Sequence, residues 1–228
     1  MHIHSLFVFT LFIICNMSIA DTAKSEDWLN AITKRDTLKL EQLLPTVQNI
    51  DRRTSKGLTA LMAAAARGDN IVVCQLLIKK AQPNLTNHRG GTALMYSSAL
   101  NHSQTVSLLI THGADVNLRA DNGWTALTLA AAKGNDKIVE KLLSSGANPN
   151  IPDVFGWTAL MRAIEHERYK STLLLTRHRD ILINRINSSG QSALHIATSV
   201  GRCDLAQVLV DAGADTQLLI LKNDVHYL

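Results

Sequence analysis

Aromatic residues are scarce in this chain of 228 residues. They make up 4% of the sequence, and three of the ten lie in its first twelve residues, at Phe7, Phe9 and Phe12. Apolar residues as a class nevertheless reach 46%, enough to bury a substantial core. Packing must therefore depend on aliphatic side chains, and disordered or low-complexity classes of protein are excluded.

An excess of charge of one sign is also missing. The 23 basic and 19 acidic residues give a net charge of +4, far short of the clustered charge of a dedicated nucleic-acid-binding protein. Nucleotide-binding, serine-hydrolase and zinc-protease motifs are absent, as is a zinc-type cysteine pair. We therefore expect no enzymatic activity, no metal and no cofactor. A haem-linked or metal-linked role is the less favoured alternative, because it would require scattered His and Cys residues to converge.

Long apolar runs are absent after the first twenty residues. The run from Leu6 to Cys15 contains ten residues, too few to span a bilayer, and small residues follow at Ser18 and Ala20, just before Asp21. This pattern predicts a signal peptide over residues 1–20, cleaved after Ala20. We expect a mature protein in a periplasm or secreted, with no membrane association after cleavage.

A fixed period is the strongest signal in the sequence. Glycines recur at intervals of 33 or 34 residues, at Gly57, Gly90, Gly123, Gly156 and Gly190. Two residues after each glycine comes Thr, or Ser in the last case, followed by Ala-Leu. A period of this length is typical of stacked structural units that share one continuous core.

Each unit is expected to contain two short helices. In the unit that begins at Gly123, Thr125 can cap a first helix rich in alanine, and Gly134 ends it. A second helix is expected from about Asp136, with apolar residues at amphipathic spacing, and Gly146 suits the left-handed residue that closes it. Turn-forming residues between units predict projecting, hairpin-like fingers.

These residues closely resemble the ankyrin-repeat family, whose pattern is G-x-T-P-L-H-x-A-A followed by a second helix and G-A-D-x-N. The resemblance implies an all-α solenoid of helix-turn-helix repeats of about 33 residues. We assign residues 21–50 to a degenerate amino-terminal repeat, 51–215 to five clear repeats and 216–228 to a tail. The family's Pro is Ala in all five clear repeats, and its His occurs only at His195.

The fifth repeat is irregular. Glu167 and Arg179 stand where the family has glycine, and one residue is inserted. A non-glycine residue is penalised in the left-handed conformation, so we expect helices there to end differently. Neutral drift and a bend that shapes a binding surface both remain open as explanations.

Ankyrin repeats bind partners through their finger tips and the exposed face of the first helix, which implies a partner-binding surface here. Trp124 and Trp157 lie one period apart and should be neighbours, with Phe155 close by. Exposed tryptophans are typical anchors of protein interfaces, whereas the alternative is that both indoles cover the finger base. The predicted partner-binding residues are Trp124, Trp157, Phe155, Arg89, Lys133, His166, Leu100 and Arg67.

The resemblance implies a non-catalytic protein-protein interaction module. As an exported protein it would be an accessory or regulatory partner of another exported protein. An inhibitor or immunity protein against a toxin and a secreted effector that binds a host protein are the alternatives. The apolar stretch Leu218 to Leu221 should cover the open face of the last repeat, leaving a monomer, and a contact between copies is the alternative.

Overall fold

The computed structural model describes residues 26–221, so the predicted signal peptide and the end of the tail lie outside the described residues. Residues 26–34 are helical and are followed by α2 (Thr37–Leu43). Five inner helices are α3 (Ala60–Arg67), α5 (Ala93–Ala99), α7 (Ala126–Lys133), α9 (Ala159–Glu165) and α11 (Ala193–Ser199). Five outer helices are α4 (Asn70–Ile78), α6 (Ser103–Thr111), α8 (Asp136–Ser144), α10 (Tyr169–Thr176) and α12 (Cys203–Asp211), and α13 (Leu218–Leu221) is the last described element.

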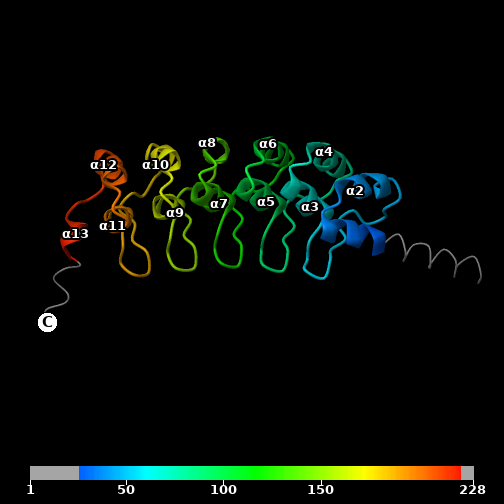
Figure 1. Cartoon of the computed structure of the whole chain (residues 1–228), viewed down its shortest axis with the longest axis horizontal. Coiled ribbons are helices and arrows are strands. Elements are labelled where there is room, and N and C mark those ends of the chain that lie inside the picture. Colours follow the sequence, from blue (N-terminus) through cyan, green and yellow to red (C-terminus); the bar gives the residue numbers. More distant parts are fainter. Residues whose placement is uncertain (1–25, 222–228) are drawn as a thin grey trace, which may run out of the picture.

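The helices form two layers in an elongated row (Figure 1). Inner helices pack side by side, each against its own outer helix, and the outer helices make the second layer. The core that runs along this row is aliphatic, with Trp28 as the one large aromatic side chain that is fully buried among the described residues. The structure thereby confirms the predicted all-α repeat fold.

Each inner helix begins at a hydroxyl side chain that caps it. Thr125 Oγ1 accepts the backbone N–H of Thr128 at 3.2 Å, as predicted, and the other inner helices are capped in the same way by Thr59, Thr92, Thr158 and Ser192. The alanines that follow are buried, which lets neighbouring inner helices approach closely. The repeated Thr-Ala-Leu sequence therefore sets where every inner helix starts.

The expectation that helices of the fifth repeat end differently is wrong at Glu167. This residue adopts a left-handed φ of +58°, the conformation that Gly68 and Gly134 adopt at the same position of other repeats. Backbone hydrogen bonds from Glu167 N to Ile164 O at 2.9 Å and from Arg168 N to Ala163 O at 2.8 Å hold this geometry despite its steric cost. Near Arg179 the helix does end differently, because α10 stops at Thr176 with no left-handed residue after it.

A finger connects each outer helix to the next inner helix. Its tip is a tight turn closed by a backbone hydrogen bond, for example from Ala120 N to Trp124 O at 2.9 Å and from Asp153 N to Trp157 O at 2.8 Å. The fingers project in a row from the inner layer (Figure 1). Between residues 26 and 221 the one β-bridge joins Ile186 and Ser192, so the fingers are tight turns and not extended β-hairpins.

Neighbouring fingers also bond to one another. The N–H of Asp121 donates to Arg89 O at 3.1 Å, and the N–H of Val154 donates to Asn122 O at 3.1 Å. Gly123 makes this contact possible, since it has a φ of +82° and a Cβ there would lie 2.7 Å from Asp153 Cα. The fingers therefore form a connected ledge that holds the candidate site in place.

Amide side chains tie consecutive repeats together at the base of the fingers. Asn84 Oδ1 accepts the N–H of Asp115 at 2.8 Å, while its Nδ2 donates to Gly113 O at 3.0 Å. Asn117 and Asn150 make the same pair of bonds to the repeat that follows each of them. This ladder satisfies backbone groups that the turns would otherwise leave without partners.

Candidate functional site

The eight residues predicted from the sequence fall in two rows. One row lies on the fingers and contains Arg89, Trp124, Phe155 and Trp157. The other row is exposed, lies at the carboxyl ends of four inner helices, and contains Arg67, Leu100, Lys133 and His166. An inner helix of seven or eight residues, about 11 to 12 Å long, lies between the two rows, so the eight residues do not make one cluster. His166 comes nearest to the finger row, since its Nε2 lies 3.8 Å from Glu165, which in turn is paired with Arg162.

Trp124 and Trp157 lie on either side of a side chain that the sequence did not single out. The guanidinium carbon of Arg162, on α9, is 5.2 Å from the ring centroid of Trp124 and 4.5 Å from that of Trp157. Both distances are within the range of cation–π contacts. Both indoles are half-buried and contact the guanidinium of Arg162. They are therefore neither fully exposed anchors nor simply a cover for the base of the fingers.

Two carboxylates complete this cluster. Arg162 forms an ion pair with Asp153, whose side chain is completely buried, and a second with Glu165 at 2.9 Å. Asp153 Oδ1 also accepts the backbone N–H groups of Phe155 and Trp157, both at 2.9 Å. Burial disfavours the charged guanidinium, but hydrogen bonds to Asp153 and Glu165 outweigh this effect and raise the pKa of Arg162.

The cluster is a fixed element of the site. Because Arg162 is paired with carboxylates inside the chain and only 14% of its side chain is exposed, it offers no free charge to a ligand. It joins the fourth repeat, which supplies Trp124, to the fifth, which supplies the other members. Phe155 remains outside it at the finger tip with 64% of its surface exposed.

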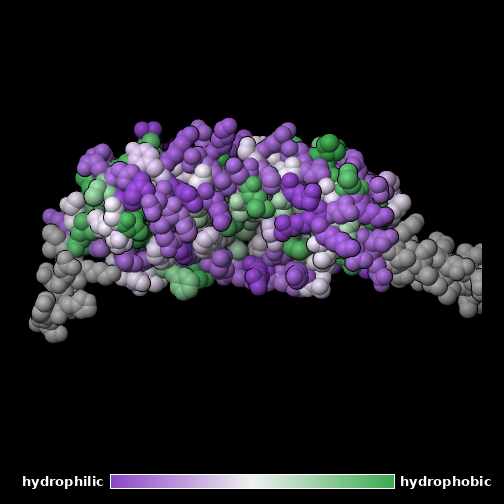
Figure 2. All heavy atoms as spheres, in the orientation of Figure 1, coloured by the Kyte–Doolittle hydropathy of each residue, from purple (hydrophilic) through white to green (hydrophobic). Residues whose placement is uncertain are grey.

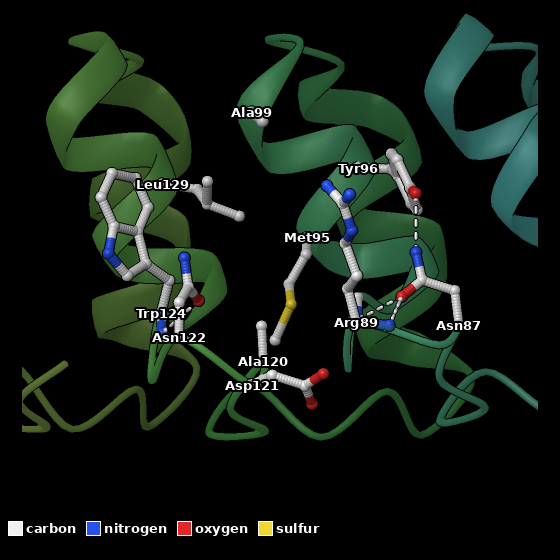
Figure 3. Close-up of a pocket in the computed structure, with 11 residues that line it drawn as sticks. Asn87, Arg89, Met95, Tyr96, Ala99, Ala120, Asp121, Asn122, Trp124 and Leu129 are labelled. Atoms are coloured by element: carbon white, nitrogen blue, oxygen red, sulfur yellow. Dashed lines mark hydrogen bonds between the residues drawn. The ribbon is translucent and has the colours of Figure 1, made fainter. Parts of the chain in front are cut away.

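An open groove lies beside this cluster, between α5 and α7 (Figure 3). Its volume is about 450 Å³. Trp124 and Leu129 form one side of it, and Arg89, Met95 and Tyr96 form the other. The remaining lining residues are Asn87, Gly91, Ala99, Ala120, Asp121 and Asn122. The groove is mainly apolar and has the size of a site for one or two side chains of a ligand.

Two small or short side chains explain why the groove is open here. At the first residue of the finger turn, other repeats carry polar side chains that accept backbone N–H groups of the turn, whereas this finger has Ala120. On α7, Leu129 occupies the position held by Tyr96 in the preceding repeat and Arg162 in the following one. Neither Ala120 nor Leu129 is long enough to fill the space between the helices.

Residues 26–221 contain no group of three or more His, Cys, Asp or Glu side chains that could hold a metal ion. That part of the chain also contains no helix with the length and apolar character needed to cross a membrane. The free thiols of Cys74 and Cys203 are half-buried and exposed, respectively.

Comparison with known families decides the assignment of the repeats. A family model described as ankyrin repeats, in three copies, matches residues 28–120, 61–153, 113–185 and 142–219. The chain belongs to the ankyrin-repeat family. Ankyrin repeats form a protein–protein interaction module that is generally non-enzymatic. No curated protein sequence matches the chain at a significant level.

His195, the one histidine at the position where the ankyrin pattern has His, has a local structural role. His195 Nδ1 lies 2.8 Å from Ser192 Oγ and accepts the backbone N–H of Ser192 at 3.2 Å, while Ser192 caps α11. The other repeats have Met or Thr at this position and are capped without it. This histidine therefore stabilises a helix start and takes no part in the groove.

Sequence reasoning missed Arg162, Asp153 and the groove, although the ankyrin repeats carried a signal for each. When the repeats are aligned on their glycines, position 162 corresponds to Ala63, Tyr96, Leu129 and Ile196, so it alone is charged. Position 120 likewise has Ala where every other clear repeat is polar. Comparing equivalent positions between repeats, and not only searching for shared motifs, would have identified them.

Proposed function

We propose that the chain is a non-catalytic binding partner of another exported protein, and that it binds this protein with the finger side of its inner helices. The observation that carries the proposal is the apolar groove between Trp124 and Tyr96, on the side where the fingers make a rigid ledge. Much of the visible surface is hydrophilic, with apolar side chains in small groups (Figure 2). An apolar groove in such a surface is a typical contact site.

Export is the second part of the proposal. It is supported by the apolar run and small residues of positions 6–20, which match a cleavable signal. In bacteria that express the full chain with a carboxy-terminal tag, the mature protein should be recovered outside the cytoplasm with Asp21 as its first residue. Intact-mass measurement checks this, and an uncleaved cytoplasmic chain would contradict it.

Site-specific photocrosslinking in the natural host tests the binding surface. A photoreactive amino acid is placed at Arg89 or Phe155 on the fingers, and at Lys137 on outer helix α8 as the matched control. All three positions are exposed, so the substitutions should leave the fold intact. We expect one discrete crosslinked protein from the finger positions and none from position 137. Crosslinks that come only from position 137, or none from any position, would contradict the proposal.

A further inference from the structure

We propose that the groove between α5 and α7 binds one large apolar side chain of a partner segment that carries carboxylates next to this anchor, on the side of the second repeat. This inference rests on the proposed function, since it names the chemistry of the partner at the same site. The anchor side chain would lie among the apolar groups of Met95, Tyr96, Trp124 and Leu129.

Tyr96, Leu129 and Arg162 occupy the same position in three consecutive inner helices, and this row shows why an anchor fits at this point. The preceding member of the row, Tyr96, has the guanidinium of Arg35 at 6.0 Å from its ring centroid. The following member, Arg162, fills the space between two indoles. Between them Leu129 leaves a space of about 450 Å³. Met95 and Trp124 line that space with adaptable and flat apolar surfaces, respectively.

A second hollow of about 460 Å³ adjoins the groove and is basic. It shares Arg89, Asn87 and Tyr96 with the groove, and Arg35, Lys56 and His88 also line it. Within residues 26–221 no carboxylate forms an ion pair with Arg35, Lys56 or Arg89, and all three residues are exposed. A partner segment that crosses this hollow would therefore gain from carrying negative charge.

The charges on the other side of the groove are different. There, Arg162 is neutralised by Asp153 and Glu165. Asp121 is the one carboxylate that lines the groove itself, and its Oδ1 lies beside Gly90, where a Cβ would be 2.9 Å away, without forming an ion pair with Arg89. Among the residues that line the groove and the adjoining hollow, the unpaired positive charge of Arg35, Lys56 and Arg89 thus lies toward the second repeat. This asymmetry fixes the orientation of the segment, with its carboxylates over Lys56 and Arg89 and its anchor between Tyr96 and Trp124.

A second copy of the chain is a poorer occupant of the groove. The exposed apolar residues of its fingers include Val154 and Phe155, but the carboxylate beside them, Asp153, is buried and already paired. Such a finger could supply an anchor without the accompanying negative charge. Leu182, in the next connection, is exposed and has Asp180 two residues before it, but Asp180 is already paired with the arginine that precedes it, at 3.4 Å. The observations therefore favour a different protein.

The test uses a displayed library of random peptides of about 12 residues, selected on residues 21–228 of the chain. We expect enriched peptides to contain one large apolar residue with Asp or Glu within a few positions of it. The matching synthetic peptides are then titrated against three variants, Ala120→Asn, Arg89→Glu and Lys137→Glu. Lys137 is exposed on α8, so Lys137→Glu is the control for the same change in net charge.

Ala120→Asn adds a polar side chain to the groove and should leave the fold intact. The new amide can accept the N–H of Asn122 and take over from Asn122 Oδ1 as the acceptor for the N–H of Trp124. Asn87 and Asn187 accept the N–H groups two and four positions after them in the same way. The thermal midpoint of the Ala120→Asn variant should equal or exceed that of the parent chain. We expect this variant and Arg89→Glu each to weaken peptide binding by about tenfold or more, and Lys137→Glu to change it by less than about twofold.

Four results would overturn the inference. Enriched peptides that lack acidic residues, peptides that bind Ala120→Asn as well as the parent chain, and no enrichment above an unrelated bait all contradict it. A dimer in sedimentation velocity that Ala120→Asn abolishes would assign the groove to a second copy, which also contradicts it. None of these results affects the crosslinking from the fingers, so the proposed function is judged separately.

Discussion

Arg162 connects the two tryptophans of the finger row by contacting both rings. Without it, Trp124 and Trp157 would be two separate half-buried rings, but its guanidinium contacts both, and the buried carboxylate of Asp153 holds it there. Removing one member of a buried ion pair leaves the other charge without a partner, which is costly. The cluster therefore has a consequence for stability that can be measured.

We predict that Arg162→Ala lowers the free energy of unfolding by about 3 kcal/mol, because Asp153 would remain buried without its counter-charge. Urea unfolding followed by circular dichroism measures the change. Arg177→Ala, at an exposed position in the same repeat, is the control and should cost less than about 0.5 kcal/mol.

A double variant separates the charge from the packing. Asp153→Asn with Arg162→Ile reproduces the pair that the sixth repeat already has in Asn187 and Ile196. It should recover stability to within about 1 kcal/mol of the parent chain. If the double variant is as unstable as Arg162→Ala, the ion pair is not what holds this part of the structure.

Asp51 is the acidic member of the amide ladder. It accepts the N–H of Gln82, but as a carboxylate it cannot donate to a carbonyl of the next repeat as Asn84 does. Burial raises the pKa of Asp51, against opposing effects of the Gln82 hydrogen bond and Arg53. Its proton is therefore held more tightly in the folded chain than in the unfolded one, and ionisation lowers stability as the pH rises above about 4.

We predict that Asp51→Asn stabilises the protein by about 0.5 to 1 kcal/mol, since the new amide can both accept and donate. The gain should be larger at about pH 7, where Asp51 is ionised, than at about pH 3, where it is neutral. Urea midpoints of both proteins at both pH values measure this. A gain that is equal at the two pH values would show that the charge of Asp51 has no influence.

Residue-scale contacts were the least accessible part of the structure from sequence. Helix caps such as Thr125 follow from local chemistry and were predicted correctly. The contact between Arg162 and Trp124 joins two repeats, and its existence depends on which rotamers meet across them. A motif search reveals shared positions, whereas this contact depends on positions where the repeats differ.

At the scale of helices, the left-handed backbone conformation at the ends of the inner helices recurs in every repeat, even where the residue is not glycine. Gly68, Asn101, Gly134, Glu167 and Gly201 occupy one phase of the repeats and all have left-handed φ values. Lys80 is left-handed at the position of Gly113 and Gly146, with φ +67°. The sequence suggested that a missing glycine would change the helix end, but the same closing backbone hydrogen bond forms without glycine, for example from Arg168 N to Ala163 O and from Ala81 N to Leu76 O.

Lys80 offers a direct test of this strain. Lys80→Gly should raise stability by up to about 1 kcal/mol, because glycine removes the steric cost of the left-handed conformation but has a more flexible unfolded state. The matched control is Lys79→Gly, one residue earlier, where φ is −77° and glycine should destabilise by about 0.5 to 1 kcal/mol. Thermal midpoints that move in the same direction for both variants would contradict the account.

At the scale of the whole molecule, the period in the sequence was sufficient to predict an all-α stack. Because each repeat packs mainly on its neighbours, the sequence of one unit determines most of the architecture. The groove could not be predicted in this way. It lies between the third and fourth repeats, where the short side chains of Ala120 and Leu129 in the fourth repeat leave space unfilled. What distinguishes this solenoid from others lies in such departures from the period.

The ends of a solenoid expose core surface, and α13 covers one of them. It packs against α11, and Leu219 is half-buried against the core. Leu219→Asp should therefore speed hydrogen exchange of amides in α11 and α12 while leaving α3 to α5 unchanged. Gln217→Asp, at an exposed position, is the control. Equal acceleration along the whole chain, or none, would contradict a local capping role.

The central claim is that the finger side of the inner helices binds a protein. Hydrogen–deuterium exchange of the mature chain, with and without the protein captured by crosslinking, tests it most directly. We predict slower exchange in the fingers and in α5 and α7 when the partner is bound, with outer helices α6 and α8 unchanged. Protection confined to the outer helices would contradict the claim.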